Sequence, residues 1–154
     1  DSWNHLMNIN AKSNFFLAQA FAKYMIKAKN GNIIFASSFA AKLSSYPCGL
    51  YAATKSIISS LSKSLAAELA QHNIRVNSYS PGVIETKMTK NAIDKNKEKI
   101  LDSISAQRFG TAQEVANAVL FLASESSGYI NGFDLEVNGG KFVIQNYSSI
   151  IEGT

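Results

Sequence analysis

The chain has 154 residues, of which 46% are hydrophobic and 17% are charged, and its formal net charge is +4. This length suffices for one buried core, and the low charged fraction argues against a disordered chain. The lysines are scattered or grouped in one short segment, and there is no arginine-rich stripe, so nucleic acid is not an expected partner. No apolar run approaches the length of a membrane span, so a membrane is not an expected partner either. The single cysteine, Cys48, excludes an internal disulfide and, with a start that lacks a signal peptide's cationic end, predicts a cytoplasmic protein.

The first element is a predicted helix over residues 2–29, whose apolar side chains follow a helical spacing on more than one face. A helix that is apolar on two sides needs two surfaces to bury against, and a sheet and a second subunit would supply them. Gly31 ends this helix. The following run NIIFAS, residues 32–37, is apolar without alternation, as in a parallel strand that is covered on both faces.

The middle of the chain repeats this order of a helix and a strand. After a turn-forming stretch with Pro47 and Gly49, residues 50–72 return to a helical pattern with one apolar face. The run IRVNSYS, residues 74–80, predicts the next strand, which Pro81 and Gly82 end.

The last part of the chain opens with a lysine-rich segment, 87–99, that has no strong apolar stripe. Thr111 and Glu114 form a capping box, which predicts the start of another helix. The run FDLEV, residues 133–137, predicts a final strand before Asn138-Gly139-Gly140, and the tail 141–154 shows no clear period.

Alternating helices and strands predict an α/β fold with a parallel sheet, right-handed crossovers and helices on both faces. No linker divides the chain, so residues 1–140 are interpreted as one unit followed by the tail 141–154. Ligands of such sheets bind beyond the carboxyl ends of the strands. The segments expected at that edge are Ser37-Ser38, residues 81–86, residues 138–140 and the helix start at Tyr51.

Tyr51 and Lys55 carry the clearest chemical signal at that edge. Of the six tyrosines, only Tyr51 has a lysine four positions later, although such a pair more often lies on a solvated helix face. A phenol is a poor proton donor at neutral pH unless a nearby cation favours the phenolate. With a serine that holds a substrate oxygen, the pair suits proton delivery to a carbonyl that receives a hydride. No Cys/His cluster or HExxH motif suggests a metal, and His5 and His72 are interpreted as ordinary surface or helix residues.

Ser38, followed thirteen positions later by Tyr51-Ala-Ala-Thr-Lys55, resembles the Ser…Tyr-x-x-x-Lys signature of the short-chain dehydrogenase/reductase family. Three further segments resemble the family's asparagine-bearing helix, its Pro-Gly loop beside the nicotinamide, and its C-terminal helix and strand: WNHLMNINAKSNFF, SPGVIET and residues 108–140. The motifs agree in order and spacing over nearly the whole chain. The resemblance implies a Rossmann-like, doubly wound parallel sheet.

The resemblance also implies catalytic roles. Tyr51 would be the acid/base on the substrate oxygen, and Ser38 would hold that oxygen. Lys55 would bind the nicotinamide ribose and favour the phenolate, while Asn10 would hold a water that relays protons. The neighbouring Ser37 is an alternative to Ser38, and Asn10 could instead kink or cap its helix.

Cofactor contacts are implied for Tyr51 and Lys55 and for four residues of the Pro-Gly loop: Pro81, Gly82, Ile84 and Thr86. The alternative for Thr86 is that it caps the helix that follows. The family's glycine-rich phosphate turn, and the residue that selects NAD or NADP, have no counterpart in this sequence. We therefore expect residues 1–140 to be the C-terminal half of a single dinucleotide-binding catalytic domain in a longer protein. The isolated chain would neither bind dinucleotide tightly nor turn over.

The substrate is the least determined part of the prediction. PGVIETKMTK and RFGTAQEVANAVLFLAS are most similar to 3-oxoacyl-acyl-carrier-protein reductases, which implies reduction of a 3-oxoacyl thioester with NADP(H) favoured over NAD(H). The lysines of segment 87–99 would favour an acidic carrier protein, or would simply be a solvated face. The alternatives are a sugar, polyol or other small-alcohol dehydrogenase of the same family and a non-catalytic half-domain scaffold. The helices 2–29 and 50–72 predict a homodimer or homotetramer.

Overall fold

The computed structural model describes residues 2–43 and 47–141. In this part of the chain, three parallel strands form one sheet in the order β1 (Gly31–Ala36), β2 (Ile74–Pro81) and β3 (Asp134–Val137). Strand β1 pairs with β2 from Gly31 opposite Ile74, and β2 pairs with β3 from Ser78 opposite Asp134. The α/β class and the parallel sheet are confirmed, and each strand lies within about one residue of its predicted range.

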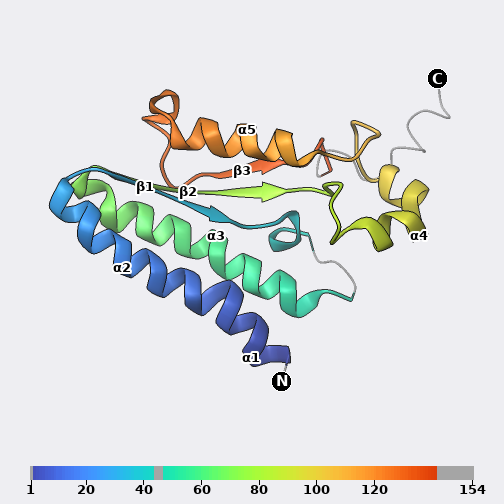
Figure 1. Ribbon diagram of the computed structural model, residues 1–154, viewed down its shortest axis with the longest axis horizontal. Coiled ribbons are helices and arrows are strands. Elements are labelled where there is room, and N and C mark those ends of the chain that lie inside the picture. Colours follow the sequence, from blue (N-terminus) through green and yellow to red (C-terminus); the bar gives the residue numbers. More distant parts are fainter. Residues whose placement is uncertain (1, 44–46, 142–154) are drawn as a thin grey trace.

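Helices cover both faces of the sheet, as predicted (Figure 1). The long helices α2 (Ser13–Ala28) and α3 (Gly49–Leu69) lie on one face, and α5 (Ala112–Ala123) lies on the other. Helix α4 (Lys90–Leu101) stands beyond the carboxyl ends of the strands, where Figure 1 shows it apart from the layers. No helix in the described residues is both long enough and apolar enough to cross a bilayer.

The helical run at the start of the chain is not the single regular helix that its periodicity predicts. A short α1 (Ser2–Leu6) leads into a π-helix, η1 (Met7–Lys12), before α2 begins. Side chains of the next turn donate hydrogen bonds to carbonyl oxygens of this π-helix. Ser13 Oγ donates to Ile9 O, and Asn14 Nδ2 donates to Asn10 O at 2.9 Å. Single π-helical turns are frequent at functional sites, and this one contains Asn10.

The main core lies between the sheet and the pair α2 and α3. Its buried members are the small residues of the two helices and the larger side chains of α3, β1 and β2: Ala18, Ala22, Phe35, Ile58, Ala66, Leu69, Ile74 and Val76. The alanines let both helices approach the sheet closely. The second apolar face predicted for this helix is exposed in α2, where it includes Phe16, Phe21 and Tyr24. That a second subunit covers this face stays a prediction.

The remaining elements are short, and several shape the ends of longer ones. A 3₁₀ turn, η2 (Phe39–Ala41), follows β1, another, η3 (Ala70–His72), ends α3, and η4 (Glu125–Ser127) follows α5. The predicted capping box is confirmed, because Thr111 Oγ1 accepts from Glu114 N while Glu114 Oε2 accepts from Thr111 N. Apart from Lys141, the predicted tail 141–154 lies outside the described residues.

Candidate active site

Tyr51 and Lys55 lie in the first turns of α3, one turn apart. The Lys55 ammonium is 5.7 Å from the centroid of the Tyr51 ring and donates a hydrogen bond to Ala36 O at 2.9 Å. The cation is therefore held between the phenol ring and the end of β1, and both residues of the pair are half-buried. Burial lowers the pKa of Lys55 below its ordinary 10.5.

Ser38 is the second residue after β1 and is only 6% exposed. It is the N-cap of η2, where its Oγ accepts a hydrogen bond from Ala40 N at 3.2 Å. That bond uses the hydroxyl as an acceptor, so its proton is available to an oxygen of a ligand. Since Lys55 bonds to the carbonyl of Ala36, the Ser38 turn begins beside the Tyr51–Lys55 pair.

The alternative serine, Ser37, is occupied by contacts with α3. Its hydroxyl lies 3.0 Å from Ser59 Oγ and 3.2 Å from Lys55 O, and the residue is buried. A hydroxyl whose proton already has two acceptors within α3 is a poor candidate for a substrate contact. This geometry favours Ser38 for that role, which remains a prediction.

Asn10 reaches the same helix from the π-helical segment. Its Nδ2 donates to Thr54 Oγ1 at 3.1 Å, and Thr54 Oγ1 in turn donates to Tyr51 O at 2.7 Å. Thr54 is fully buried between these groups. No sequence pattern indicates this role for Thr54, because Thr54 occupies one of the unspecified positions of the Tyr-x-x-x-Lys pattern. The π-helix agrees with the alternative that Asn10 disturbs its helix, and the relay of protons through a water stays a prediction.

The loop 81–86 continues from β2 beside this edge. Gly82 N donates to Val137 O at 2.9 Å, and a Cβ on Gly82 would lie 2.7 Å from Asn138 Cα, so the close approach of the two chains requires glycine here. Ile84 is buried and forms a single parallel bridge with Gly110.

Thr86 occupies the turn that precedes α4. Its carbonyl accepts from Lys90 N at 3.1 Å, and its hydroxyl lies 3.1 Å from Thr89 Oγ1. The N-cap of α4 is Thr89, so the alternative that Thr86 caps this helix is wrong, and the bonds of Thr86 shape the preceding turn. The cofactor contacts predicted for Pro81, Gly82, Ile84 and Thr86 remain predictions.

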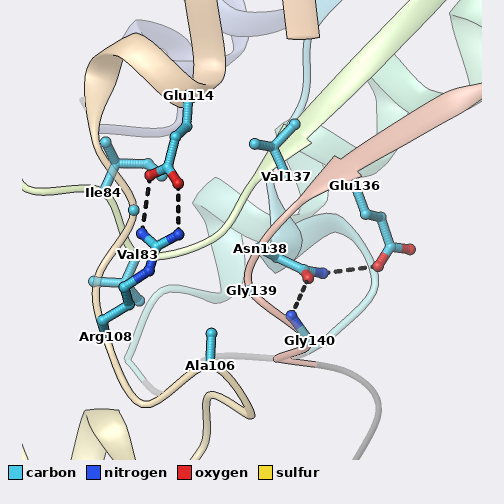
Figure 2. A pocket seen from close by; sticks show the side chains of 11 residues that line it. Val83, Ile84, Ala106, Arg108, Glu114, Glu136, Val137, Asn138, Gly139 and Gly140 are labelled. Atoms are coloured by element: carbon cyan, nitrogen blue, oxygen red, sulfur yellow. Dashed lines mark hydrogen bonds and ion pairs between the residues drawn. The ribbon is translucent and has the colours of Figure 1, made fainter. Parts of the chain in front are cut away.

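A hollow of about 320 Å³ adjoins this loop (Figure 2). Ile84 lines it, together with an ion pair in which Arg108 Nη2 is 2.6 Å from Glu114 Oε1. Hydrogen bonds from Arg108 and then from Thr111 lower the pKa of Glu114 to about 2. Tyr51 and Ser38 are not among the lining residues. The hollow therefore borders the predicted cofactor loop but does not contain the hydroxyl groups expected to act on a substrate.

Comparison with known proteins decides the family. The family described as Enoyl-(Acyl carrier protein) reductase matches residues 1–141. The chain belongs to the short-chain dehydrogenase/reductase family. The predicted family is thus confirmed.

Individual relatives agree with this assignment. The chain is 41% identical over 144 residues to 3-oxoacyl-acyl-carrier-protein reductase FabG of Escherichia coli (strain K12), a match that covers 94% of this chain and 59% of that protein. A gluconate 5-dehydrogenase from Burkholderia cenocepacia J2315, solved in complex with NADP and tartrate, superposes with a TM-score of 0.91 at 33% identity, over 94% of this chain and 58% of that one.

A 3-oxoacyl-acyl-carrier-protein reductase from Brucella melitensis ATCC 23457 superposes with a TM-score of 0.85 at 37% identity, over 91% of this chain and 53% of that one. The chain therefore spans little more than half the length of these relatives. That the chain corresponds to one half of a larger catalytic domain stays a prediction.

Proposed function

We propose that this chain is the C-terminal, catalytic half of an NADP(H)-dependent oxidoreductase that interconverts a ketone and a secondary alcohol, with a 3-oxoacyl thioester as its substrate. The observation that carries the proposal is the position of the Lys55 ammonium, which is held between the Tyr51 ring and the end of β1, beside the Ser38 turn. Such an arrangement joins a proton donor, a cation and an oxygen-binding hydroxyl at one edge of the sheet.

The residues present fit a nicotinamide dinucleotide by the chemistry of their donors. Lys55 Nζ has three N–H groups, and the bond to Ala36 O uses one of them, which leaves donors for ribose hydroxyls. The loop with Pro81, Gly82, Ile84 and Thr86 would bracket the nicotinamide and its phosphates. When bound, the dinucleotide supplies or accepts the hydride.

In the direction of reduction, Ser38 donates a hydrogen bond to the substrate carbonyl oxygen as negative charge develops on it. Tyr51 then gives its hydroxyl proton to that oxygen. The Lys55 ammonium stabilises the phenolate that remains, and Asn10, fixed to Thr54, would hold the water through which a proton returns.

The thioester substrate is supported by the similarity to FabG and by charge. Five lysines in and just before α4 are exposed beyond the strand ends, where an acidic carrier protein would meet the site: Lys87, Lys90, Lys95, Lys97 and Lys99. A sugar-acid dehydrogenase is the second candidate, because the NADP-bound gluconate 5-dehydrogenase superposes with a TM-score of 0.91. Steady-state turnover of acetoacetyl coenzyme A and of a gluconate and polyol panel would separate the two.

The substitution Tyr51→Phe in the full-length protein tests the proposal. We expect kcat to fall by at least about 10²-fold, because the general acid is removed while the ring is kept. NADPH binding, followed by nucleotide fluorescence, should persist. Tyr129→Phe is the matched control, since Tyr129 is a fully exposed tyrosine outside α2 and α3, and it should leave kcat unchanged. Full activity of Tyr51→Phe would refute the role of Tyr51 as general acid, whereas absence of turnover by the wild type would favour the non-catalytic scaffold.

Assembly through α2 and α3 is a further part of the proposal. The exposed apolar side chains of these helices support it, including Phe16 and Phe21 on α2 and Ile57 on α3. Light scattering of the full-length protein should report a dimer or tetramer. A clean monomer would remove the assembly from the proposal and leave the catalytic part intact.

A further inference from the structure

Asp134 is a buried carboxylate at the start of β3, and no catalytic or cofactor role accounts for it. It is 8% exposed, and both of its oxygens accept from Ser80 Oγ at 2.9 Å. Ser59 Oγ donates to Oδ2 at 3.1 Å, and the Lys42 ammonium lies 3.5 Å from the same oxygen. Because burying a charge is costly, a carboxylate kept here with this many partners needs an explanation.

One arm of this network reaches the residue before Ser38. The single proton of Ser59 is directed to the Asp134 carboxylate, because hydrogen bonds to a charged acceptor are the stronger ones. Ser59 Oγ must then accept in its 3.0 Å contact with Ser37, so the Ser37 hydroxyl donates toward α3. The Ser37 proton has a second acceptor on α3, Lys55 O at 3.2 Å, so Asp134 supports one of the two contacts that hold Ser37 against the helix.

A second arm reaches the other end of the Ser38 turn. Lys42 directly follows η2, the turn for which Ser38 is the N-cap, and its ammonium contacts Asp134 and bonds to Glu136 Oε1. Partial burial lowers the pKa of Lys42, but the hydrogen bond to Glu136 and the charges of the two carboxylates outweigh it, so this pKa is raised. Lys42 therefore stays charged and ties the end of the turn to β3.

We propose that Asp134 is a positioning residue that acts through Ser38, because it holds the Ser38 turn from both ends, through Ser37 before it and Lys42 after it. Ser80, the third partner, precedes Pro81 and joins the same carboxylate to the predicted cofactor loop. Asp134 does not itself contact the reacting groups. The inference rests on the proposed function, in which Ser38 binds the developing oxyanion, and it adds the group that sets the place of that hydroxyl.

The substitution Asp134→Asn in the full-length protein, assayed with NADPH and acetoacetyl coenzyme A, tests this role. A displaced oxyanion donor should lower kcat by about 10- to 100-fold with little change in KM, because the interaction is made in the transition state. In a Ser38→Ala background the same substitution should cost less than about twofold, since the group through which it acts is gone. Glu125→Gln is the matched control, because Glu125 is an exposed carboxylate of η4 outside this network, and kcat should stay unchanged.

Equal losses from Asp134→Asn with and without Ser38 would show that the carboxylate serves stability alone and would overturn the inference. If Asp134→Asn does not fold, Lys42→Met takes its place, because Lys42 is exposed and its replacement leaves the core intact. Its loss of kcat must then also become smaller in the Ser38→Ala background.

A readout that needs no turnover separates this inference from the proposed function. The Ala40 amide donates to Ser38 Oγ, so its hydrogen exchange reports the order of the turn. Asp134→Asn should speed that exchange by at least about tenfold relative to Glu125→Gln. Unchanged exchange contradicts the positioning role whatever the substrate is, whereas faster exchange in a protein that reduces no ketone would refute only the catalytic proposal.

Discussion

The hydroxyl of Thr54 joins the π-helix to α3, and its removal by Thr54→Val gives a sharp prediction. Valine keeps the shape of the side chain but leaves Asn10 Nδ2 without its acceptor and Tyr51 O without this donor. Each hydrogen bond contributes about 1 kcal/mol, so we expect a loss of about 2 kcal/mol in the free energy of unfolding. For a protein of this size, that corresponds to a fall of about 4–8 °C in Tm.

Thermal unfolding of the full-length protein, followed by circular dichroism, measures this loss. Asn10→Ala and the double variant complete a cycle, in which the Asn10–Thr54 pair should show a coupling of about 1 kcal/mol. Ser64→Ala is the control on the same helix, since the exposed Ser64 hydroxyl bonds to Ser60 O within α3, and it should cost less than about 0.5 kcal/mol. Strictly additive single effects would refute the reasoning, because they would mean that the two side chains do not interact.

Two further predictions concern the loop after β2 and the start of α5. Gly82→Ala should destabilise the protein to urea by about 1–3 kcal/mol, because the new Cβ meets the backbone of Asn138. Gly49→Ala, where the new Cβ would meet no atom of the described residues within 4 Å, should be harmless, and similar behaviour of the two variants would contradict the steric argument. The hydrogen bond from Arg108 is the largest cause that lowers the pKa of Glu114 from 4.5 to about 2 in the folded protein. The ionised Glu114 side chain therefore stabilises the fold fully above pH 4.5, and this stabilisation is lost as the pH falls toward 2. The difference in Tm between the wild type and Glu114→Gln should therefore shrink across that range, and a constant difference would show that the ion pair does not set the pKa.

The sequence by itself determined the order of the elements and the identity of the catalytic candidates. The strands β1, β2 and β3 and the capping box at Thr111 follow from local signals, namely apolar runs, turn residues and the spacing of a hydroxyl and a carboxylate. The family signature of Ser38, Tyr51 and Lys55 also depends only on distances along the chain. Such features can be predicted from the sequence because the residues that define each of them are near one another along the chain.

Only the tertiary structure decided which of these groups touch. The choice between Ser37 and Ser38 depends on which hydroxyl faces α3, and the π-helix at Asn10 accompanies a bond to Thr54 from 44 positions away. The sequence shows Asp134 only as an acidic residue of the final predicted strand, yet its carboxylate accepts a hydrogen bond from Ser59, 75 positions earlier in the chain. Side-chain hydrogen bonds of this kind depend on the strand register and on how closely a helix approaches the sheet. No local sequence pattern shows which distant side chains these two factors bring together.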